Sequence, residues 1–144
     1  MSAPPIITSP RLELWSLGAS FLEASLAGER AAAAAMLEAT IPDDWWQARK
    51  LAELRLQDLR GDMELRPWLL RAMLRRSDRT MIGHVGFHWR PGSPHLAEYA
   101  AGGVELGYEV FPAFRRQGYA TEAVAAMLDW ATAQGVPSFA LSIA

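Results

Sequence analysis

Six consecutive residues, Arg-Arg-Gln-Gly-Tyr-Ala at positions 115–120, have the composition of a phosphate-binding loop. They lie between a strand-like run at residues 104–111 and a helix-like run at residues 121–134. Gly118 can adopt backbone angles that a side chain would forbid, and it lets a ligand approach the main chain. The first N–H groups of the following helix have no partner within it and lie at the positive end of its dipole. We therefore predict that this loop binds an anion such as phosphate, with Arg115 and Arg116 adding charge at its mouth.

Two other phosphate-binding motifs are excluded by their spacing. The Walker loop requires Gly-x-x-x-x-Gly-Lys-Ser/Thr, and dinucleotide-binding folds require Gly-x-Gly-x-x-Gly early in a strand-helix-strand unit. Neither pattern occurs in the chain. The remaining alternative for Gly118 is an ordinary glycine turn that opens a helix without binding a ligand.

Two histidines form a second candidate group. His84 and His88 lie four residues apart in a strand-like run, so both face the same side of a sheet. Such a pair could bind a metal or supply a general base. No third ligand stands at a recognisable spacing, and His95 lies in a loop. Because a structural zinc site normally takes four ligands, we predict no metal and expect packing or hydrogen bonding near a cleft.

The composition indicates one compact domain, residues 1–144, because most domains have about 100–150 residues. Hydrophobic residues make up 51% and charged residues 21%, with 14 basic against 16 acidic side chains, which argues against disorder and against a nucleic-acid partner. The absence of cysteine excludes disulfides and thiolate catalysis. No apolar run approaches the roughly 20 residues of a spanning helix, and the start does not resemble a secretory signal. We expect a cytoplasmic protein without a membrane partner.

Hydrophobic periodicity and the positions of glycine and proline predict an α/β chain. The expected elements are a strand at 11–17, a helix pair at 21–26 and 29–39 interrupted at Gly28, a helix capped by Asp43 or Asp44 and ending at Gly61, a hairpin of 67–76 and 80–88, a loop at 90–103, a strand at 104–111, a helix at 121–134 and a strand from 138. The strand, helix, strand order after residue 104 predicts a crossover between parallel strands.

Several segments together resemble one enzyme family. Arg115, Gly118 and Ala120 match the Gln/Arg-x-x-Gly-x-Gly/Ala signature of the Gcn5-related N-acetyltransferase (GNAT) superfamily. Residues 8–14, 82–87, 105–112 and 119–123 resemble its RimJ/RimL branch, which acetylates protein N-termini. The resemblance spans residues 6–144 and implies a GNAT-like mixed central sheet with flanking helices.

The resemblance implies that acetyl-coenzyme A is the cosubstrate and that an amine attacks its thioester directly. Carried over by position, the pyrophosphate would be held by Arg115, Arg116, Gln117, Gly118, Tyr119 and Ala120. Val110 and the nearby backbone would pair with the pantetheine arm, as another strand would. Because an amine is partly or wholly protonated near pH 7, a base is expected. Glu105 is the leading candidate and Glu109, on the same strand face, is the second; a solvated or salt-bridged carboxylate is the alternative for either.

The acceptor predicted by this resemblance is a primary amine, such as a protein N-terminus, with a small-molecule amine as the alternative. Trp45 and Trp46 would border the acceptor site or, alternatively, belong to the core or a subunit contact. An arginine-rich stretch of the hairpin is expected to be solvated, with binding of acidic acceptors or nucleic acid as a minor alternative; its members are Arg71, Arg75, Arg76 and Arg79.

The chain stops before the last helix and strand pair that family members usually have, so we expect a C-terminally shortened domain. The notable consequence is an unpaired strand, which favours pairing with another chain. Three hypotheses follow: a partial chain, a homodimer that completes the sheet, or a shortened protein with little activity. A module that binds coenzyme A or dimerises without turnover, and a domain that binds peptides along its sheet edge, are the alternatives to an enzyme.

Overall fold

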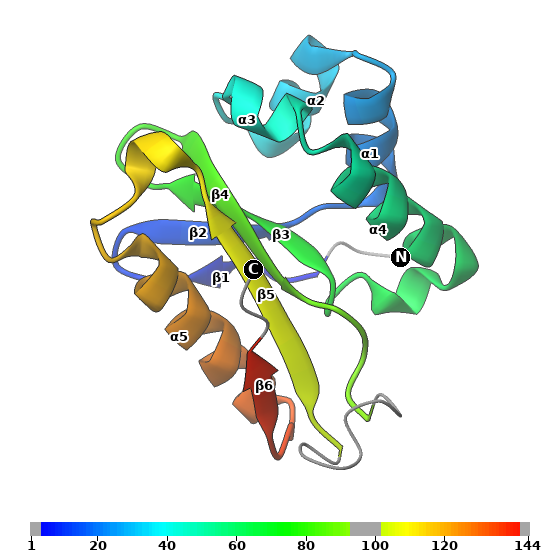
Figure 1. Ribbon diagram of the computed structural model, residues 1–144, viewed down its shortest axis with the longest axis vertical. Coiled ribbons are helices and arrows are strands. Elements are labelled where there is room, and N and C mark those ends of the chain that lie inside the picture. Colours follow the sequence, from blue (N-terminus) through cyan, green and yellow to red (C-terminus); the bar gives the residue numbers. More distant parts are fainter. Residues whose placement is uncertain (1–3, 93–101, 142–144) are drawn as a thin grey trace.

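The computed structural model describes residues 4–92 and 102–141 and contains a mixed six-stranded sheet with helices on both faces (Figure 1). The strands lie in the order β1-β2-β3-β4-β5-β6, and all neighbours are antiparallel except β5 and β6, which are parallel. The elements are β1 (Ile7–Thr8), β2 (Leu12–Ser16), α1 (Ala19–Leu26), α2 (Arg30–Leu37), α3 (Asp43–Trp46), α4 (Arg49–Gly61), β3 (Leu70–Arg75), β4 (Thr80–Phe87), β5 (Val104–Val110), α5 (Tyr119–Ala133) and β6 (Phe139–Leu141). The predicted α/β class is confirmed.

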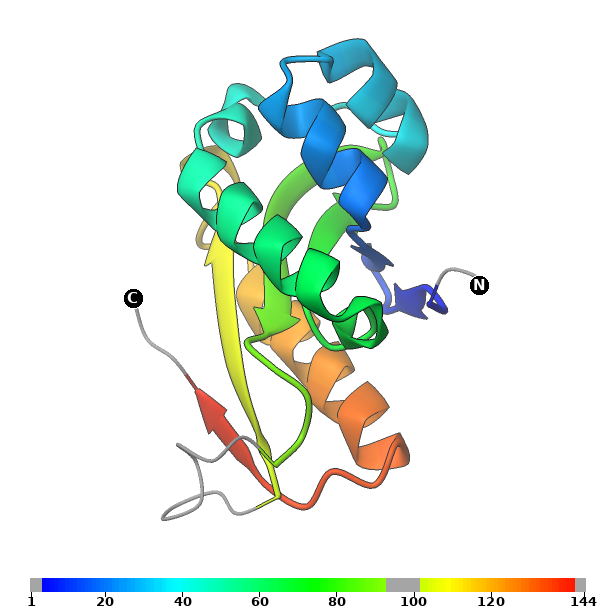
Figure 2. The same ribbon diagram turned by 90° about the vertical axis from the view of Figure 1, so that its right-hand side faces the viewer.

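Each face of the sheet has its own hydrophobic core, because successive side chains of a strand point to opposite faces. Leu70, Ala72 and Leu74 of β3 are buried against α1–α4, whereas Met73 is buried with Met127 of α5 on the other face. Figure 2 shows the helices α1–α4 and the helix α5 on opposite sides of the strands. The sheet therefore lies between the helices α1–α4 and the helix α5.

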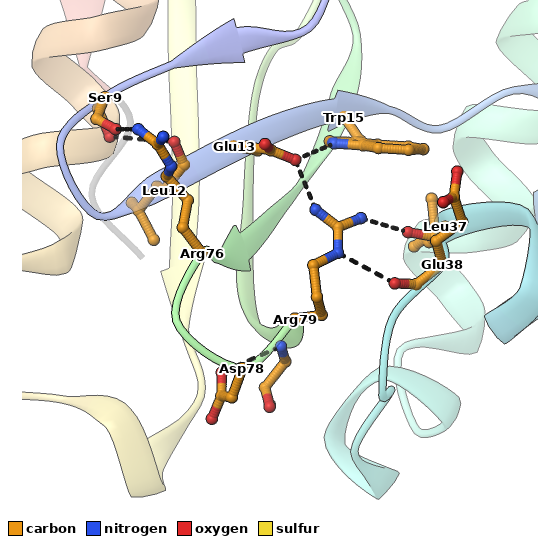
Figure 3. Close-up of polar contacts among 10 residues, drawn as sticks. Ser9, Leu12, Glu13, Trp15, Leu37, Glu38, Arg76, Asp78 and Arg79 are labelled. Atoms are coloured by element: carbon orange, nitrogen blue, oxygen red, sulfur yellow. Dashed lines mark hydrogen bonds and ion pairs between the residues drawn. The ribbon is translucent and has the colours of Figure 1, made fainter.

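The predicted hairpin is confirmed, because β3 and β4 pair antiparallel up to Arg75 and Thr80. Its turn also contacts the helical layer through Arg79 (Figure 3). The Arg79 guanidinium donates to the carbonyls of Leu37, at 2.9 Å, and Glu38, at 3.1 Å, where α2 ends, and to the Glu13 carboxylate of β2. Its positive charge lies at the negative end of the α2 dipole, a favourable position.

The prediction that all four arginines of the hairpin are solvated is wrong for Arg71. Arg71 is fully buried, and its guanidinium donates to the carbonyl groups of Pro5, Leu14 and Pro67. It also lies 5.3 Å from the centre of the Trp130 ring. Burial lowers the pKa of Arg71 to about 10, which still leaves it charged at neutral pH. Position 71 faces inward because the pleat of β3 alternates, and charge alone did not indicate this.

The helical segment after Pro42 differs from the prediction in two ways. The single helix expected up to Gly61 is divided into α3 and α4, because Ala48 has non-helical backbone angles of φ −83° and ψ 43°. The predicted caps, Asp43 and Asp44, instead lie in the first turn of α3 and accept no capping hydrogen bond there. The helix pair around Gly28 is confirmed as α1 and α2, with Gly28 at φ 75° between them.

The predicted crossover after residue 104 is confirmed by the parallel pairing of β5 with β6, between Val104 and Phe139 and on to Leu106 and Leu141. The intervening helix α5 begins at Tyr119, two residues earlier than predicted, and is followed by Gly135 at φ 91°. Part of the expected loop at 90–103, including His95, lies outside the described residues. Within residues 4–92 and 102–141, no helix has the length and apolar character needed to span a membrane.

Candidate active site

A cavity of about 680 Å³ opens beside the carboxyl end of β5. Its walls come from β4 and β5, from the loop that follows β5, from the first turn of α5 and, on the other side of the sheet, from α4. The predicted anion-binding loop and the two predicted histidines, His84 and His88, contribute to this same cavity. Residues far apart in the chain are thus brought to one place by the crossover and by the β4–β5 pairing.

Gly118 begins the helix at one end of the cavity and has a left-handed backbone, with φ 82° and ψ 8°. The first helical hydrogen bond is donated by Glu122 to the Gly118 carbonyl, at 3.1 Å. The N–H groups of Tyr119, Ala120 and Thr121 therefore have no acceptor within α5, and all three residues line the cavity. This geometry, together with the helix dipole, suits a phosphate group.

Most of the residues predicted to hold the cofactor line this cavity. They are Val110, Arg115, Arg116, Gly118, Tyr119 and Ala120. Gln117 is not part of the lining; its carbonyl oxygen accepts a hydrogen bond from Arg11 Nη1 at 2.8 Å. Arg116 has a positive φ of 65°, so the loop takes left-handed backbone at both Arg116 and Gly118.

Arg11 supports the loop from the β1–β2 turn, and sequence reasoning missed this role. Its Nε donates to Glu122 Oε1 at 2.7 Å, and its guanidinium lies 4.2 Å from the centre of the Tyr119 ring. Ser9 also donates to Glu122. Burial alone would raise the pKa of Glu122, but the hydrogen bonds from Ser9 and Arg11 outweigh it and lower that pKa. These partners lie more than 100 positions apart in the sequence, so no local spacing could reveal them.

The edge of β5 beside the cavity presents backbone groups. Phe111 donates its N–H to Ile82 of β4 at 2.8 Å. Because successive residues of a strand direct their backbone groups to opposite edges, those of Val110 face away from β4. The Val110 carbonyl accepts a hydrogen bond from Arg115 Nε at 2.7 Å. Strand β6 pairs with this edge at residues 104–106, so the stretch beside Val110 is the part that faces the cavity.

The other end of the cavity contains two histidine–carboxylate pairs. His88 Nδ1 lies 3.0 Å from Glu105 Oε1, and His84 Nε2 lies 3.4 Å from Glu109 Oε2. His84, His88 and Glu109 line the cavity, whereas Glu105 lies behind His88. Burial lowers the pKa of His84, and the Glu109 carboxylate opposes this shift. Because His84 and His88 both line this cavity, the prediction that they face the same side of the sheet is confirmed.

Neither of the two predicted tryptophans lines the cavity, but Trp45 contacts His84, which does. Trp45 is a core residue, 1% exposed, and its ring lies edge-on to His84 at 6.1 Å between centres. Leu51 and Arg55 of α4 line the cavity itself, and sequence reasoning missed both. They lie on a helix with many charged residues, so the sequence did not indicate which face of that helix would line the cavity.

The described residues contain no group of three or more histidine, aspartate or glutamate side chains placed to hold a metal ion. What the site offers instead is a helix N-terminus with arginines at one end and proton-accepting side chains at the other, joined along a strand edge. This arrangement can hold a phosphate-bearing group and take a proton from a second molecule.

Comparisons with known proteins agree with this geometry. A family model described as an acetyltransferase (GNAT) domain matches residues 18–144. Among solved structures, a protein assigned as a ribosomal-protein-serine acetyltransferase from Vibrio cholerae has a TM-score of 0.59 and 20% identity, covering 98% of this chain and 75% of its own. RimL, a ribosomal alpha-N-protein acetyltransferase in complex with coenzyme A, has a TM-score of 0.56 and 19% identity, covering 95% and 73%.

A third structure, the microcin C7 self-immunity acetyltransferase MccE in complex with acetyl-coenzyme A and AMP, has a TM-score of 0.54 and 12% identity, covering 92% of this chain and 69% of its own. No curated protein sequence matches the chain. At these identities the structural likeness shows the shared fold, and the family model covers the cavity and both of its ends. The chain belongs to the GNAT family of acetyltransferases, and acetyl-coenzyme A is its cosubstrate.

Proposed function

We propose that this acetyltransferase moves the acetyl group of acetyl-coenzyme A to a primary amine and that a protein N-terminus is the acceptor. The observation that carries the proposal is the single cavity that joins the start of α5 to the histidine–carboxylate pairs along the edge of β5. The likeness to RimL and to the Vibrio cholerae protein, both described as acting on ribosomal proteins, supports this acceptor class.

In this proposal the phosphates of the cosubstrate bind the N–H groups at the start of α5. Arg115 and Arg116 contribute charge, Gln117 contributes its backbone N–H, and Gly118, Tyr119 and Ala120 form the turn itself. The backbone of Val110 pairs with the pantetheine arm, in the manner of an added strand. When bound, acetyl-coenzyme A supplies an activated acetyl thioester beside the carboxyl end of β5.

The acceptor binds on the α4 side of the cavity. Glu109 provides a negative charge that attracts an ammonium group, and Glu105 supports removal of its proton. Transfer needs the neutral amine, and an α-amino group has a pKa near 8, about two units below that of lysine. The N-terminal amine is therefore the easier acceptor at neutral pH.

A small-molecule amine is the second candidate, and the likeness to MccE favours it, because MccE was solved with AMP as well as acetyl-coenzyme A. The described lining of the cavity also includes Arg55, whose guanidinium is paired with Asp58 at 2.9 Å. Such a half-buried cation would suit a carboxylate or phosphate on a small acceptor.

An acceptor panel tests the proposal. The protein is incubated with acetyl-coenzyme A and, separately, with a peptide that has a free N-terminus, the same peptide with a blocked N-terminus and an internal lysine, and a small diamine. We expect mass spectrometry to find the acetyl group on the free N-terminus only. Acetylation of the diamine alone would establish the second candidate, and binding of acetyl-coenzyme A without any product would indicate a non-catalytic module.

A cytoplasmic location and a homodimer that completes the sheet beside β6 remain predictions. Phe139 and Leu141 of β6 are 37% and 50% exposed, which is consistent with a partner at this strand. Sedimentation of the protein with and without acetyl-coenzyme A would measure the oligomeric state directly.

A further inference from the structure

We propose that His88 is the side chain that takes the proton from the acceptor amine and that Glu105 is a positioning residue behind it. The inference rests on the proposed acetyl transfer to an amine. It assigns different roles to His88 and Glu105 at the histidine–carboxylate end of the cavity. It differs from the expectation that the Glu105 carboxylate is itself the base, because the imidazole of His88 lies between Glu105 and the cavity.

The contact between the two side chains fixes which nitrogen of His88 can accept a proton. His88 Nδ1 lies 3.0 Å from Glu105 Oε1. An ionised carboxylate only accepts hydrogen bonds, so the proton of the neutral imidazole must reside on Nδ1. The lone pair is then on Nε2, as in other sites where a carboxylate orients a histidine.

His88 Nε2 lies over Gly107 of β5, and both residues line the cavity. A Cβ atom on Gly107 would lie only 2.6 Å from His88 Nε2 and 3.3 Å from Cε1, so the ring lies directly against the backbone of Gly107. Gly107 also lines the cavity, as His88 does, and it pairs with Gly86 across the two strands. The absence of a side chain at this position therefore makes the space that the imidazole fills.

His84 is less suited to the same task. Its residue is 6% exposed, and its ring lies edge-on to both Trp45 and Phe111. Its Nε2 is buried and has no hydrogen-bond partner among the described residues, although the Glu109 carboxylate lies 3.4 Å away. His88, with a side chain that is 32% exposed, is the histidine that an incoming amine can reach.

The proton balance of the step is simple. The amine nitrogen forms a bond to the acetyl carbon, and the carbon–sulfur bond breaks with its electron pair going to sulfur. The proton that the amine loses goes to His88 Nε2 and then to the released thiolate, which leaves as coenzyme A. Glu105 keeps its charge throughout and stabilises the transient imidazolium through Nδ1.

The other charged or titratable side chains around the cavity are Arg55, His84, Tyr108, Glu109, Arg115, Arg116 and Tyr119.

The test compares the pH dependence of kcat/KM for three variants with the wild type. His88→Gln removes the titrating group but keeps an amide at the Nε2 position, and we expect a loss of about 100-fold or more with the acidic limb of the profile abolished. Glu105→Gln keeps the imidazole, so we expect a lower plateau with an acidic limb that is retained. Glu53→Gln, an exposed carboxylate on α4, controls for the general loss of charge.

A second measurement does not depend on turnover. In ¹⁵N spectra of the histidine ring, we expect the Nδ1-protonated form of neutral His88 in the wild type and a shift toward the Nε2-protonated form in Glu105→Gln. His88→Gln should still bind acetyl-coenzyme A in calorimetry, because the phosphate-binding end is untouched. A His88→Gln enzyme with the wild-type rate and acidic limb would overturn the proposal, and so would Nε2 protonation in the wild type. A wild type that acetylates no amine would instead overturn the proposed function.

Discussion

At the scale of single residues, two glycines shape the wall of the cavity. Gly118 adopts φ 82° where α5 begins, which turns the first N–H groups of the helix toward the cavity. Gly107 lies in regular strand and is needed for a different reason, because the ring of His88 occupies the place of its missing side chain. One glycine is thus required by its backbone angles and the other by close contact.

Replacing Gly107 by alanine tests this close contact. The new Cβ would lie 2.6 Å from His88 Nε2, so the imidazole must move. We expect kcat/KM for acetyl transfer to fall by about tenfold or more, as displacement of a catalytic group commonly causes, while the affinity for acetyl-coenzyme A stays near that of the wild type.

Gly61→Ala is the matched control, because Gly61 has no atom within 4 Å of a Cβ. It should leave both quantities unchanged. An unchanged kcat/KM in Gly107→Ala would mean that the position of the His88 ring is not important for the reaction.

The sequence predicted residues that line the cavity better than it predicted the contacts that support them. Gly118, Arg115 and Arg116 could be found because one short motif contains them. Arg11 could not, since it reaches Glu122 and Gln117 only after the chain has folded. The partner of Glu105 was also hidden, because its contact with His88 depends on the register of β4 against β5.

At the scale of elements, Arg79 connects three parts of the fold (Figure 3). Its guanidinium reaches the end of α2 and the Glu13 carboxylate of β2, and it lies 5.1 Å from the centre of the Trp15 ring. Hydrogen bonds from Trp15 and Arg79 lower the pKa of Glu13, although burial opposes them. The hairpin turn thereby holds the helical layer against the sheet.

Arg79→Ala should reduce the free energy of unfolding by about 1–2 kcal/mol, because two carbonyls and one carboxylate lose their donor in a partly solvated place. Urea unfolding at pH 7 measures this loss. The control is Arg76→Ala in the same turn, since Arg76 is exposed and donates to the Ser9 carbonyl at 3.0 Å. Equal losses in the two variants would show that Arg79 has no special role in connecting the layers.

Glu122 connects the β1–β2 turn to α5, and its stabilising effect should depend on pH. The pKa of this carboxyl is lowered below its ordinary value of 4.5 in the folded protein. A carboxyl with a lowered folded-state pKa stabilises the fold above its ordinary pKa and loses this effect as the pH falls through the folded value.

We therefore expect Glu122→Gln to be less stable than the wild type by about 1–2 kcal/mol at pH 7. The difference should shrink as the pH falls below 4.5. Urea unfolding of both proteins at a series of pH values measures it. A difference that stays constant across this range would contradict the pairing with Ser9 and Arg11.

Elements with a strong local signal were predicted well. The hairpin around residues 76–79 and the helix α5 followed from alternation and from helical spacing. The break between α3 and α4 was not predicted, because no glycine or proline marks Gln47 and Ala48. The break accompanies the burial of Trp45 against Phe21, a tertiary contact that local propensity cannot indicate.

At the scale of the whole molecule, the sheet separates two cores and the cavity joins their two sides. In the proposed function, the start of α5 binds the phosphates of the cosubstrate, and α4 with the histidine–carboxylate pairs binds the acceptor. A ligand that binds both ends would stabilise the folded protein, by about 2.7 kcal/mol at a concentration of 100 times its Kd. The sequence predicted this overall plan through the strand, helix, strand order after residue 104.

We propose that the left-handed turn at Gly118 holds acetyl-coenzyme A, and calorimetric titration measures this binding. The proteins compared are the wild type, Gly118→Val and Gly28→Val. Gly28 has a similar φ of 75°, and a Cβ there would meet no atom within 4 Å, so its variant carries the same backbone strain away from the cavity. A left-handed backbone costs a non-glycine residue about 1–2 kcal/mol.

We predict that the wild type and Gly28→Val bind acetyl-coenzyme A with the same affinity and that Gly118→Val binds it at least about tenfold more weakly, since 1.4 kcal/mol corresponds to a factor of ten. Equal affinities in all three proteins would contradict this role of Gly118, because the cosubstrate would then bind without the turn at the start of α5.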